Sequence, residues 1–195
     1  MLATAIMRMS DPEIAMLTTA VSTARHYLEY GAGGSTKLAV RIPTVSSVTS
    51  VESDFAFIRS HLSGDVDIQA ATESGRLRFL IVDIGPTGAW GHPLDRSKAY
   101  LWPNYALCPY LHDYHPDLIL IDGRFRIACS LAAALQAPDA TILIHDYSNR
   151  QHYHILEGFL QIEDGVDTLV RCRRRANLDE DSARRLLGAS LYLPA

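Results

Sequence analysis

One glycine-rich stretch, residues 25 to 39, constrains the fold of this chain more than any other. Its first part, Tyr27 to Tyr30, is aromatic and favours an extended backbone. Its glycines are Gly31, Gly33 and Gly34. Glycine permits positive φ and the close approach of a ligand, and Ser35 or Thr36 can cap a helix that begins just after the turn. The stretch therefore predicts a strand, a tight turn and a helix, the junction at which open parallel sheets bind ligands.

The spacing of these glycines separates two classes of cofactor. A dinucleotide-binding loop follows G-x-G-x-x-G, and the third glycine, counted from Gly31 and Gly33, is replaced here by Thr36. The motif Glu29-x-Gly31-x-Gly33-x-Ser35 instead resembles the first motif of class I S-adenosylmethionine (SAM)-dependent methyltransferases. In that family the acid ends the first strand, and the glycines let the backbone approach the methionine part of SAM. The ammonium and sulfonium charges of SAM favour a nearby carboxylate. A plain strand–helix turn is the alternative that the motif alone leaves open.

Strand-like and helix-like segments alternate along the rest of the chain. We expect strands near residues 25–30, 44–51, 77–84, 117–121, 141–145 and 165–172, and helices near 11–21, 35–40, 55–62, 124–135 and 149–160. Residues 63–76 suit either a strand or a helix. This alternation predicts an α/β fold, a doubly wound, mostly parallel sheet of the Rossmann-like, class I methyltransferase type with helices on both faces. Residues 1–195 make one such domain, and the order and direction of the last strands are left open.

Acidic residues end most of the predicted strands. They are Glu29, Glu52, Asp83, Asp122 and Asp146. Because the carboxyl ends of parallel strands meet at one edge of a sheet, we expect these acids to line a ligand site there. Glu52 lies 23 residues after Glu29, and the resemblance implies that it accepts from the ribose hydroxyls of SAM; the alternative is an acid that serves the next helix. Asp83 suits the exocyclic amine of the adenine, or is a solvated strand-end acid. The predicted cofactor site consists of Glu29, Gly31, Gly33, Ser35, Thr36, Glu52, Ser53, Asp83, Ile84 and Asp122.

The segment from Gly85 to Pro93 predicts a long structured loop, since it holds three glycines, two prolines and a tryptophan. Such a loop in a small domain is more often a lid or a binding loop than a spacer. Trp90 could stack on the adenine or close over the substrate, and His92 could act as a base. The alternative for Trp90 is that it anchors the loop to the core.

A second motif follows the fourth predicted strand. Asp122-Gly123 and His145-Asp146-Tyr147 resemble the region of small-molecule O-methyltransferases in which Ile-Asp-Gly precedes a later His-Asp-Tyr. In the metal-dependent members, two strand-end aspartates help to bind a divalent cation. Arg124 and Arg126 depart from that pattern and suit an anionic substrate, or are charges on a helix surface. We therefore assign no metal, and a divalent cation is the less favoured alternative. The candidate catalytic residues are Asp122, Asp146 and His92, and the candidate substrate-binding residues are Trp90, Arg124 and Tyr147.

Composition narrows the class of partner. The net charge of −4 over 195 residues argues against a general nucleic-acid binder, which is usually basic. No apolar stretch approaches the roughly 20 residues that a membrane span needs. The three cysteines are widely spaced and form no C-x-x-C pair, which fits a reducing cytoplasm. We expect a cytoplasmic protein with a small-molecule partner, and a homodimer is left open.

These patterns predict a SAM-dependent methyltransferase that acts on a small molecule, at oxygen rather than at a ring nitrogen. The protein would mainly orient the two reactants, and a base would take the proton of a hydroxyl acceptor. The alternative is a non-catalytic, methyltransferase-like protein that binds SAM or serves in protein interaction, since no unmistakable base or metal triad is present. A nicotinamide-dependent oxidoreductase is disfavoured by Thr36 at the third glycine position.

Overall fold

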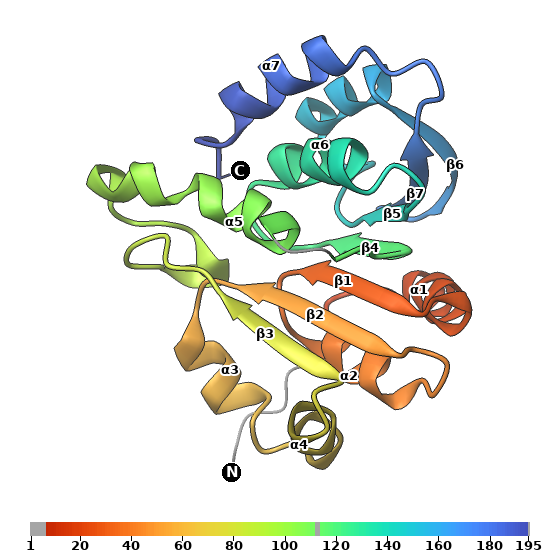
Figure 1. The fold of residues 1–195 in the computed structure, drawn as a ribbon, viewed down its shortest axis with the longest axis vertical. Helices are drawn as coiled ribbons and strands as arrows, with labels where there is room; N and C mark the ends of the chain where they lie inside the picture. Colours follow the sequence, from red (N-terminus) through yellow and green to blue (C-terminus); the bar gives the residue numbers. More distant parts are fainter. Residues whose placement is uncertain (1–6, 112–113, 195) are drawn as a thin grey trace.

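The computed structural model describes residues 7–111 and 114–194 (Figure 1). They build a seven-stranded sheet with the strand order β3-β2-β1-β4-β5-β7-β6. The strands are β1 (His26–Tyr30), β2 (Ser47–Glu52), β3 (Leu77–Ile81), β4 (Leu118–Ile121), β5 (Thr141–Ile144), β6 (Leu160–Val166) and β7 (Leu169–Arg174). Strands β1 to β5 pair in parallel, whereas β7 runs antiparallel to both β5 and β6. The predicted fold class, a mostly parallel sheet of the class I methyltransferase type, is confirmed.

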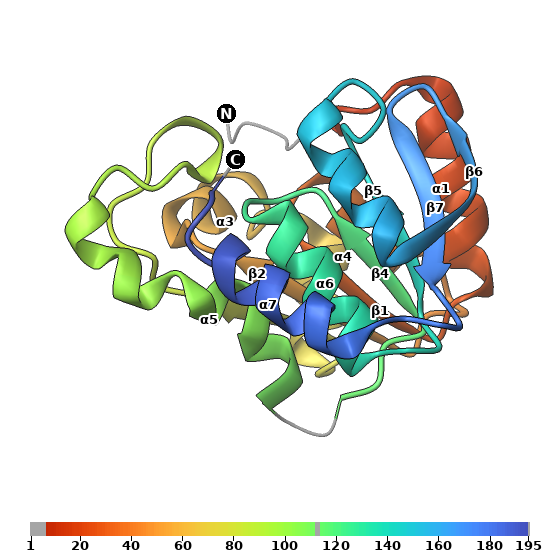
Figure 2. The ribbon, with the colours of Figure 1, turned by 90° about the horizontal axis from the view of Figure 1, so that it is seen from above.

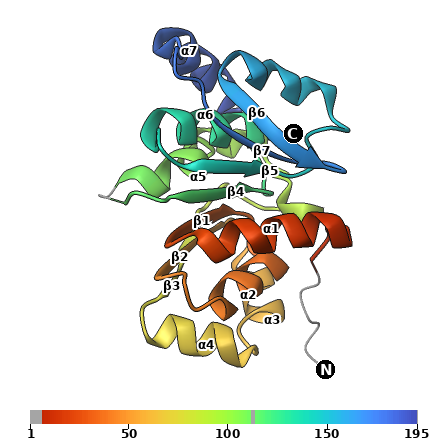
Figure 3. The same cartoon turned by 90° about the vertical axis from the view of Figure 1, so that its right-hand side faces the viewer.

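Helices cover both faces of the sheet (Figure 3). The helices are α1 (Asp11–Thr23), α2 (Gly34–Arg41), α3 (Phe55–His61), α4 (Val66–Glu73), α5 (Pro103–Leu107), α6 (Arg126–Gln136) and α7 (Glu180–Ser190), and 3₁₀ helices span Ala89–Gly91, Arg96–Leu101, Cys108–Leu111 and Gln151–Gly158. Helices α1 to α4 lie on one face, and α5, α6 and α7 lie on the other.

Strand β4 shows why the sheet needs both layers. All four of its residues are buried. Leu118 and Leu120 pack into the core under α1 and α2, whereas Ile119 and Ile121 pack into the core under α6. A strand that is buried on both faces has apolar residues at every position, and the β4 sequence shows this pattern.

Helix α1 begins where its capping signals predict. The Ser10 side chain accepts from the backbone N–H of Glu13, while the Glu13 carboxylate accepts from the backbone N–H of Ser10, and Pro12 lies in the first turn. This capping box satisfies two backbone donors that a helix start leaves free. Glu13 also turns inward and is buried.

Two segments differ from the sequence-based expectation. The strand expected at 165–172 is a hairpin: β6 ends at Val166, Asp167 takes a left-handed φ of 50°, and β7 begins at Leu169. Strand β6 lies at the edge of the sheet and mostly faces solvent, so it lacks an apolar run that would have revealed it. The amphipathic helix expected at 149–160 is a 3₁₀ helix, Gln151–Gly158, and it gives way to β6. The ambiguous residues 63–76 contain helix α4.

The C-terminal helix α7 lies alongside α6 on the outer side of the domain (Figure 2). Its Ala183 joins the core, while most of its other residues are exposed or half-buried. Within the described ranges, no helix combines the length and the apolar character that crossing a membrane requires.

Candidate functional site

A cleft of about 1030 Å³ opens at the carboxyl ends of the parallel strands. Its walls come from the loops that follow β1, β2, β4 and β5 and from the segment 88–92. Strand β1 lies between β2 and β4, so the cleft sits at the point where the strand order reverses. Open α/β sheets bind ligands at this point. The volume is at the upper end of the roughly 300–1,000 Å³ of ligand pockets, enough for more than one small molecule.

Two glycines bring the loops after β1 and β4 into contact. Gly31 has a φ of 95°, and a Cβ there would lie 2.9 Å from the backbone nitrogen of Gly123. A Cβ at Gly123 would lie 2.1 Å from the hydroxyl of Tyr105 and 3.0 Å from the nitrogen of Gly31. No side chain fits between these backbones. A Cβ at Gly33 would meet nothing within 4 Å, so the open part of the loop borders the cleft.

Glu29 lies behind the glycine loop rather than in the cleft. It is fully buried, and its carboxylate accepts from the hydroxyls of Tyr27 (3.1 Å), Ser35 (2.6 Å) and Thr36. Burial raises the pKa of Glu29 to about 7, although the Ser35 and Thr36 hydrogen bonds oppose this. The carboxylate thus ties β1 to the start of α2. Of the two hydroxyl residues, Ser35 lines the cleft and Thr36 is buried.

Glu52, the last residue of β2, is buried and lines the cleft. One carboxylate oxygen accepts from the backbone N–H groups of Ser53 (2.6 Å) and Asp54 (2.9 Å). The other accepts from the N–H of Ala32 in the glycine loop, at 3.1 Å. Burial raises the pKa of Glu52 despite these three donors. A buried carboxylate that borders a cleft has lone pairs left for the hydroxyl of a ligand.

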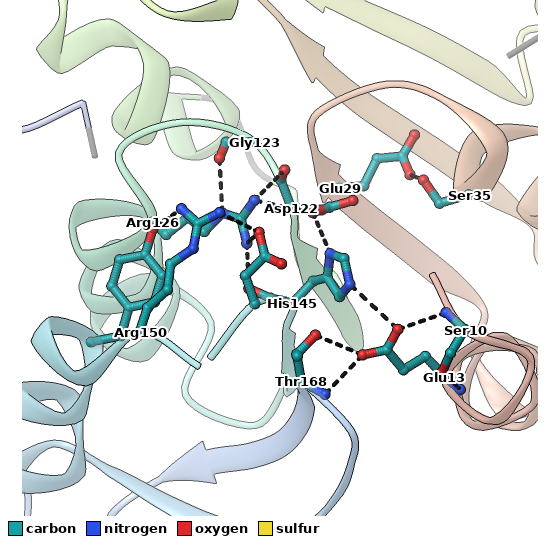
Figure 4. A network of polar contacts seen from close by, with 12 residues as sticks. Ser10, Glu13, Glu29, Ser35, Asp122, Gly123, Arg126, His145, Arg150 and Thr168 are labelled. Atoms are coloured by element: carbon teal, nitrogen blue, oxygen red, sulfur yellow. Dashed lines mark hydrogen bonds and ion pairs between the residues drawn. The ribbon is translucent and has the colours of Figure 1, made fainter. Parts of the chain in front are cut away.

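The carboxyl ends of β4 and β5 are joined by an arginine (Figure 4). Arg126 is almost fully buried and forms ion pairs with Asp122 Oδ1 (3.2 Å) and Asp146 Oδ2 (3.1 Å). It also donates to the backbone carbonyls of Gly123, Asp122 and His145. Arg150 pairs with the same Asp146 oxygen at 2.7 Å. Leaving the buried Arg126 guanidinium without its carboxylates would be strongly unfavourable, so this cluster fixes both strand ends.

His145 lies between two carboxylates, Asp122 and Glu13, in the same network (Figure 4). Its Nδ1 is 2.8 Å from Asp122 Oδ1, and its Nε2 is 3.5 Å from Glu13 Oε2. Burial disfavours the imidazolium, but the hydrogen bond and charge of Asp122, followed by the charges of Asp146 and Glu13, outweigh it and raise the pKa of His145. The Glu13 carboxylate also accepts from the backbone N–H (2.9 Å) and the hydroxyl (2.7 Å) of Thr168. Helix α1 is thereby attached to the β6–β7 turn and to the cleft.

Asp122, His145 and Asp146 are the side chains that come nearest to a metal site among the described residues. Their donor atoms lie within 4.8 Å of one another. Arg126 already pairs with both carboxylates, and Arg150 pairs with one of them. A divalent cation here would meet these positive charges at short range. The two carboxylates therefore have arginines as their counter-charges, and this arrangement does not favour a metal ion.

Other predicted residues fall inside and outside the cleft. Trp90 is 72% exposed, with a left-handed φ of 61° and the Arg8 guanidinium 5.5 Å from its ring. The lining also includes residues predicted for other roles, namely Ser53, His92 and Arg124. Besides Glu29 and Thr36, three predicted residues do not line it. Asp83 is exposed and accepts from the N–H of Gly85, Ile84 is in the core, and Tyr147 is buried and stacks on His154. The roles of all these residues stay predictions.

Sequence reasoning missed several cleft residues. Arg8, Arg150 and Tyr105 line the cleft, and Glu13 supports it through His145. Arg150 follows Asp146 by four positions, but the two residues lie in a turn rather than in a helix, so the helical spacing rule would not have predicted their ion pair. Glu13 carried no signal either, because its partners Thr168 and His145 are distant in sequence.

A seven-stranded sheet in this order, with a cleft at the switch point, defines the class I methyltransferase fold. A methyltransferase-like protein from Silicibacter pomeroyi DSS-3 has the same fold with a TM-score of 0.84 and 32% identity, over 98% of this chain and 99% of that one. The chain belongs to the family of this methyltransferase-like protein.

More distant solved structures share the fold alone. A putative caffeoyl-CoA O-methyltransferase from Staphylococcus aureus is 12% identical with a TM-score of 0.52, over 87% of this chain and 86% of that one. A putative tRNA (m1A22) methyltransferase from Streptococcus pneumoniae is also 12% identical with a TM-score of 0.50, over 90% and 76%. No protein-family model matches the sequence, and no curated protein matches it significantly.

Proposed function

We propose that the protein transfers the methyl group of SAM to an oxygen atom of a small-molecule acceptor. The observation that carries this proposal is the cleft at the switch point, where the glycine loop after β1, the buried Glu52 after β2 and Asp122 after β4 meet. Membership of the methyltransferase-like family supports it.

The residues present fit SAM. The backbone at Gly31 and Gly33 borders the cleft without side chains, which leaves room for the methionine part. Glu52 offers carboxylate lone pairs to ribose hydroxyls in a site shielded from water. Glu52 and Asp54 also bring negative charge to this side of the cleft. This charge favours the positively charged sulfonium of SAM. When bound, SAM supplies an activated methyl group.

The chain itself would orient the acceptor and take its proton. Oδ1 of Asp122 is held by Arg126 and His145, so within the described residues Oδ2 is left to accept the proton of a hydroxyl. Arg126 and His145 fix the direction of this carboxylate, and such positioning contributes much of the rate in a transfer between two bound partners. Asp146 and His92 line the same cleft and are the other candidates for the base.

Backbone strain is concentrated at this site. Trp90, Phe125 and Asp146 all have left-handed φ values, of 61°, 55° and 57°, without being glycine. Each such residue costs on the order of 1–3 kcal/mol, which the surrounding structure must offset. Trp90 and Asp146 line the cleft, and Phe125 lies between Arg124 and Arg126, which also line it. Strain of this kind supports a functional role for these three loops.

A small acceptor is favoured over nucleic acid by shape and charge. The cleft is concave and its volume suits a cofactor together with a small molecule. The net charge of the chain is −4, which gives little attraction for a phosphate backbone.

The test is the formation of S-adenosylhomocysteine from SAM in the presence of pooled small hydroxylated compounds. At saturating SAM, turnover by Asp122→Asn should be about 10²–10⁴-fold lower than turnover by wild type. Asp139→Asn, an exposed acid before β5 at the opposite edge of the sheet, is the matched control. SAM binding without turnover in any pool would favour the non-catalytic alternative, and absence of SAM binding would contradict the proposal.

A further inference from the structure

Arg124 differs from the other buried or half-buried arginines of the cleft in its partners. Arg126 and Arg150 form ion pairs with Asp122 and Asp146, whereas Arg124 forms no ion pair with any residue in the ranges 7–111 and 114–194. It lines the cleft and is only partly exposed. Of the three arginines Arg124, Arg126 and Arg150, it is therefore the one without a counter-charge among the described residues.

The guanidinium of Arg124 also has an unsatisfied donor. Its Nε is buried and has no hydrogen-bond partner among the described residues. Burial, and then the positive charge of Arg126, lower the pKa of Arg124. A buried N–H without an acceptor is unfavourable, so the Arg124 guanidinium is incompletely paired among the described residues. Because Arg124 lines the cleft, an anion bound there would face a cation that has no counter-charge in the described ranges.

The backbone around Arg124 is held firmly. The next residue, Phe125, is left-handed at φ 55° and almost fully buried, with its ring 5.7 Å from that of Trp102 and 5.6 Å from that of Tyr105. On the preceding side, Gly123 contacts the glycine loop closely. The Arg124 side chain then lies beside the loop 85–93, since a Cβ at Gly91 would lie 3.9 Å from its Cγ. A donor that is positioned in advance loses less entropy when it binds.

We propose that Arg124 binds an oxyanion of the methyl acceptor, a carboxylate or a phosphate group, within the cleft. A guanidinium recognises both groups through two parallel N–H···O bonds, and the pairing is strong where water is excluded. That Arg124 binds an oxyanion is independent of the proposed function. That this oxyanion is part of the methyl acceptor rests on the proposed function. The proposal narrows the acceptor class to anions that carry two groups. One is the oxyanion that Arg124 binds, and the other is a hydroxyl or a further carboxylate whose oxygen receives the methyl group.

The test is a calorimetric titration of inorganic phosphate, and separately of benzoate, into the protein saturated with S-adenosylhomocysteine. Wild type should bind at least one of these probes. Arg124→Leu should weaken that binding at least tenfold, and Arg124→Lys should restore part of it because the charge is retained without the fork geometry. Arg25→Leu is the matched control and should bind as wild type does, because Arg25 is exposed at the amino end of β1, opposite the cleft. Thermal unfolding of each variant checks that it is folded.

Three outcomes would overturn the proposal. One is the absence of probe binding to wild type, and another is an equal affinity in wild type and Arg124→Leu. The third is a tenfold loss of S-adenosylhomocysteine affinity in Arg124→Leu, because that result would assign Arg124 to the carboxylate of the cofactor. If S-adenosylhomocysteine does not bind to wild type, the proposed function fails, and phosphate is then titrated into the protein alone. Binding that depends on Arg124 in that experiment would still support the oxyanion site.

Discussion

The substitution Glu13→Gln should loosen the attachment of α1 to the cleft. Glu13 uses both carboxylate oxygens: one accepts twice from Thr168, and the other accepts from the backbone of Ser10 and faces His145. A glutamine offers only one oxygen, so its amide nitrogen must face a donor on one side or the other. We expect lower stability at neutral pH and a smaller dependence of stability on pH.

The magnitude follows from the pKa of Glu13. Burial disfavours the carboxylate, but the hydrogen bonds from Thr168 and Ser10 outweigh it and lower the pKa to about 2, from an ordinary 4.5. This difference corresponds to about 3 kcal/mol as an upper bound, and we expect about 1–2 kcal/mol because glutamine keeps one of the two oxygens and its hydrogen bonds. Because the folded-state pKa is lowered, the contribution is complete above about pH 4.5 and is lost as the pH falls toward about 2.

Urea unfolding at pH 7, 5, 4 and 3 measures this contribution as the difference between wild type and Glu13→Gln. The difference should be about 1–2 kcal/mol at pH 7 and should shrink below pH 4.5. Asp11→Asn changes an exposed acid in the same helical turn and is the control, with little expected effect. A difference that stays constant with pH, or an equal effect of Asp11→Asn, would refute this reasoning. Nuclear magnetic resonance should also show a lower pKa of His145 in Glu13→Gln, because one of its carboxylate partners is gone.

Two further substitutions test the glycine loop and its support. Burial raises the pKa of Glu29 to about 7, so the ionised carboxylate is unfavourable in the folded protein. Wild type should therefore lose stability as the pH rises from about 4.5 to about 7, and Glu29→Gln should become more stable relative to it. A stability difference in thermal unfolding that does not change with pH would contradict this. Gly123→Ala should destabilise the protein by about 1–3 kcal/mol, because its Cβ would lie 2.1 Å from the Tyr105 hydroxyl. The same substitution in a Tyr105→Phe background should cost less, and an equal cost in both backgrounds would show that this contact is not the cause.

The sequence predicted those parts of the structure that depend on local patterns. The apolar run of β4 and the glycine turn after β1 each specify their own conformation, and sheet geometry then brings Glu52 and Asp122 to one edge. The same rule placed Asp83 at that edge. Because β3 ends at Ile81, Asp83 instead faces solvent in the following turn.

What could not be predicted depends on contacts between distant segments. Tyr147 follows Asp146 in sequence, but the left-handed φ at Asp146 turns the two side chains to different surroundings, so Tyr147 is buried outside the cleft. Glu13 looks like an ordinary acid in the first turn of a helix, and its contact with Thr168 exists only after β6 and β7 have formed their hairpin. Long-range pairings of this kind leave no periodic signal in the chain.

The binding of SAM is the property on which the proposed function depends most directly. Calorimetric titration of wild type with SAM should give a micromolar dissociation constant. Glu52→Gln keeps one oxygen, which can accept from Ser53 and Asp54, and turns its amide nitrogen toward the Ala32 N–H and the cleft. It should weaken binding by about 1–3 kcal/mol, roughly fivefold to a hundredfold, because a buried oxygen that serves the glycine loop and a ribose hydroxyl is lost. Glu73→Gln, an exposed acid on α4, should bind as wild type does. No heat of binding in wild type, or an unchanged affinity in Glu52→Gln, would contradict the assignment of this cleft to SAM.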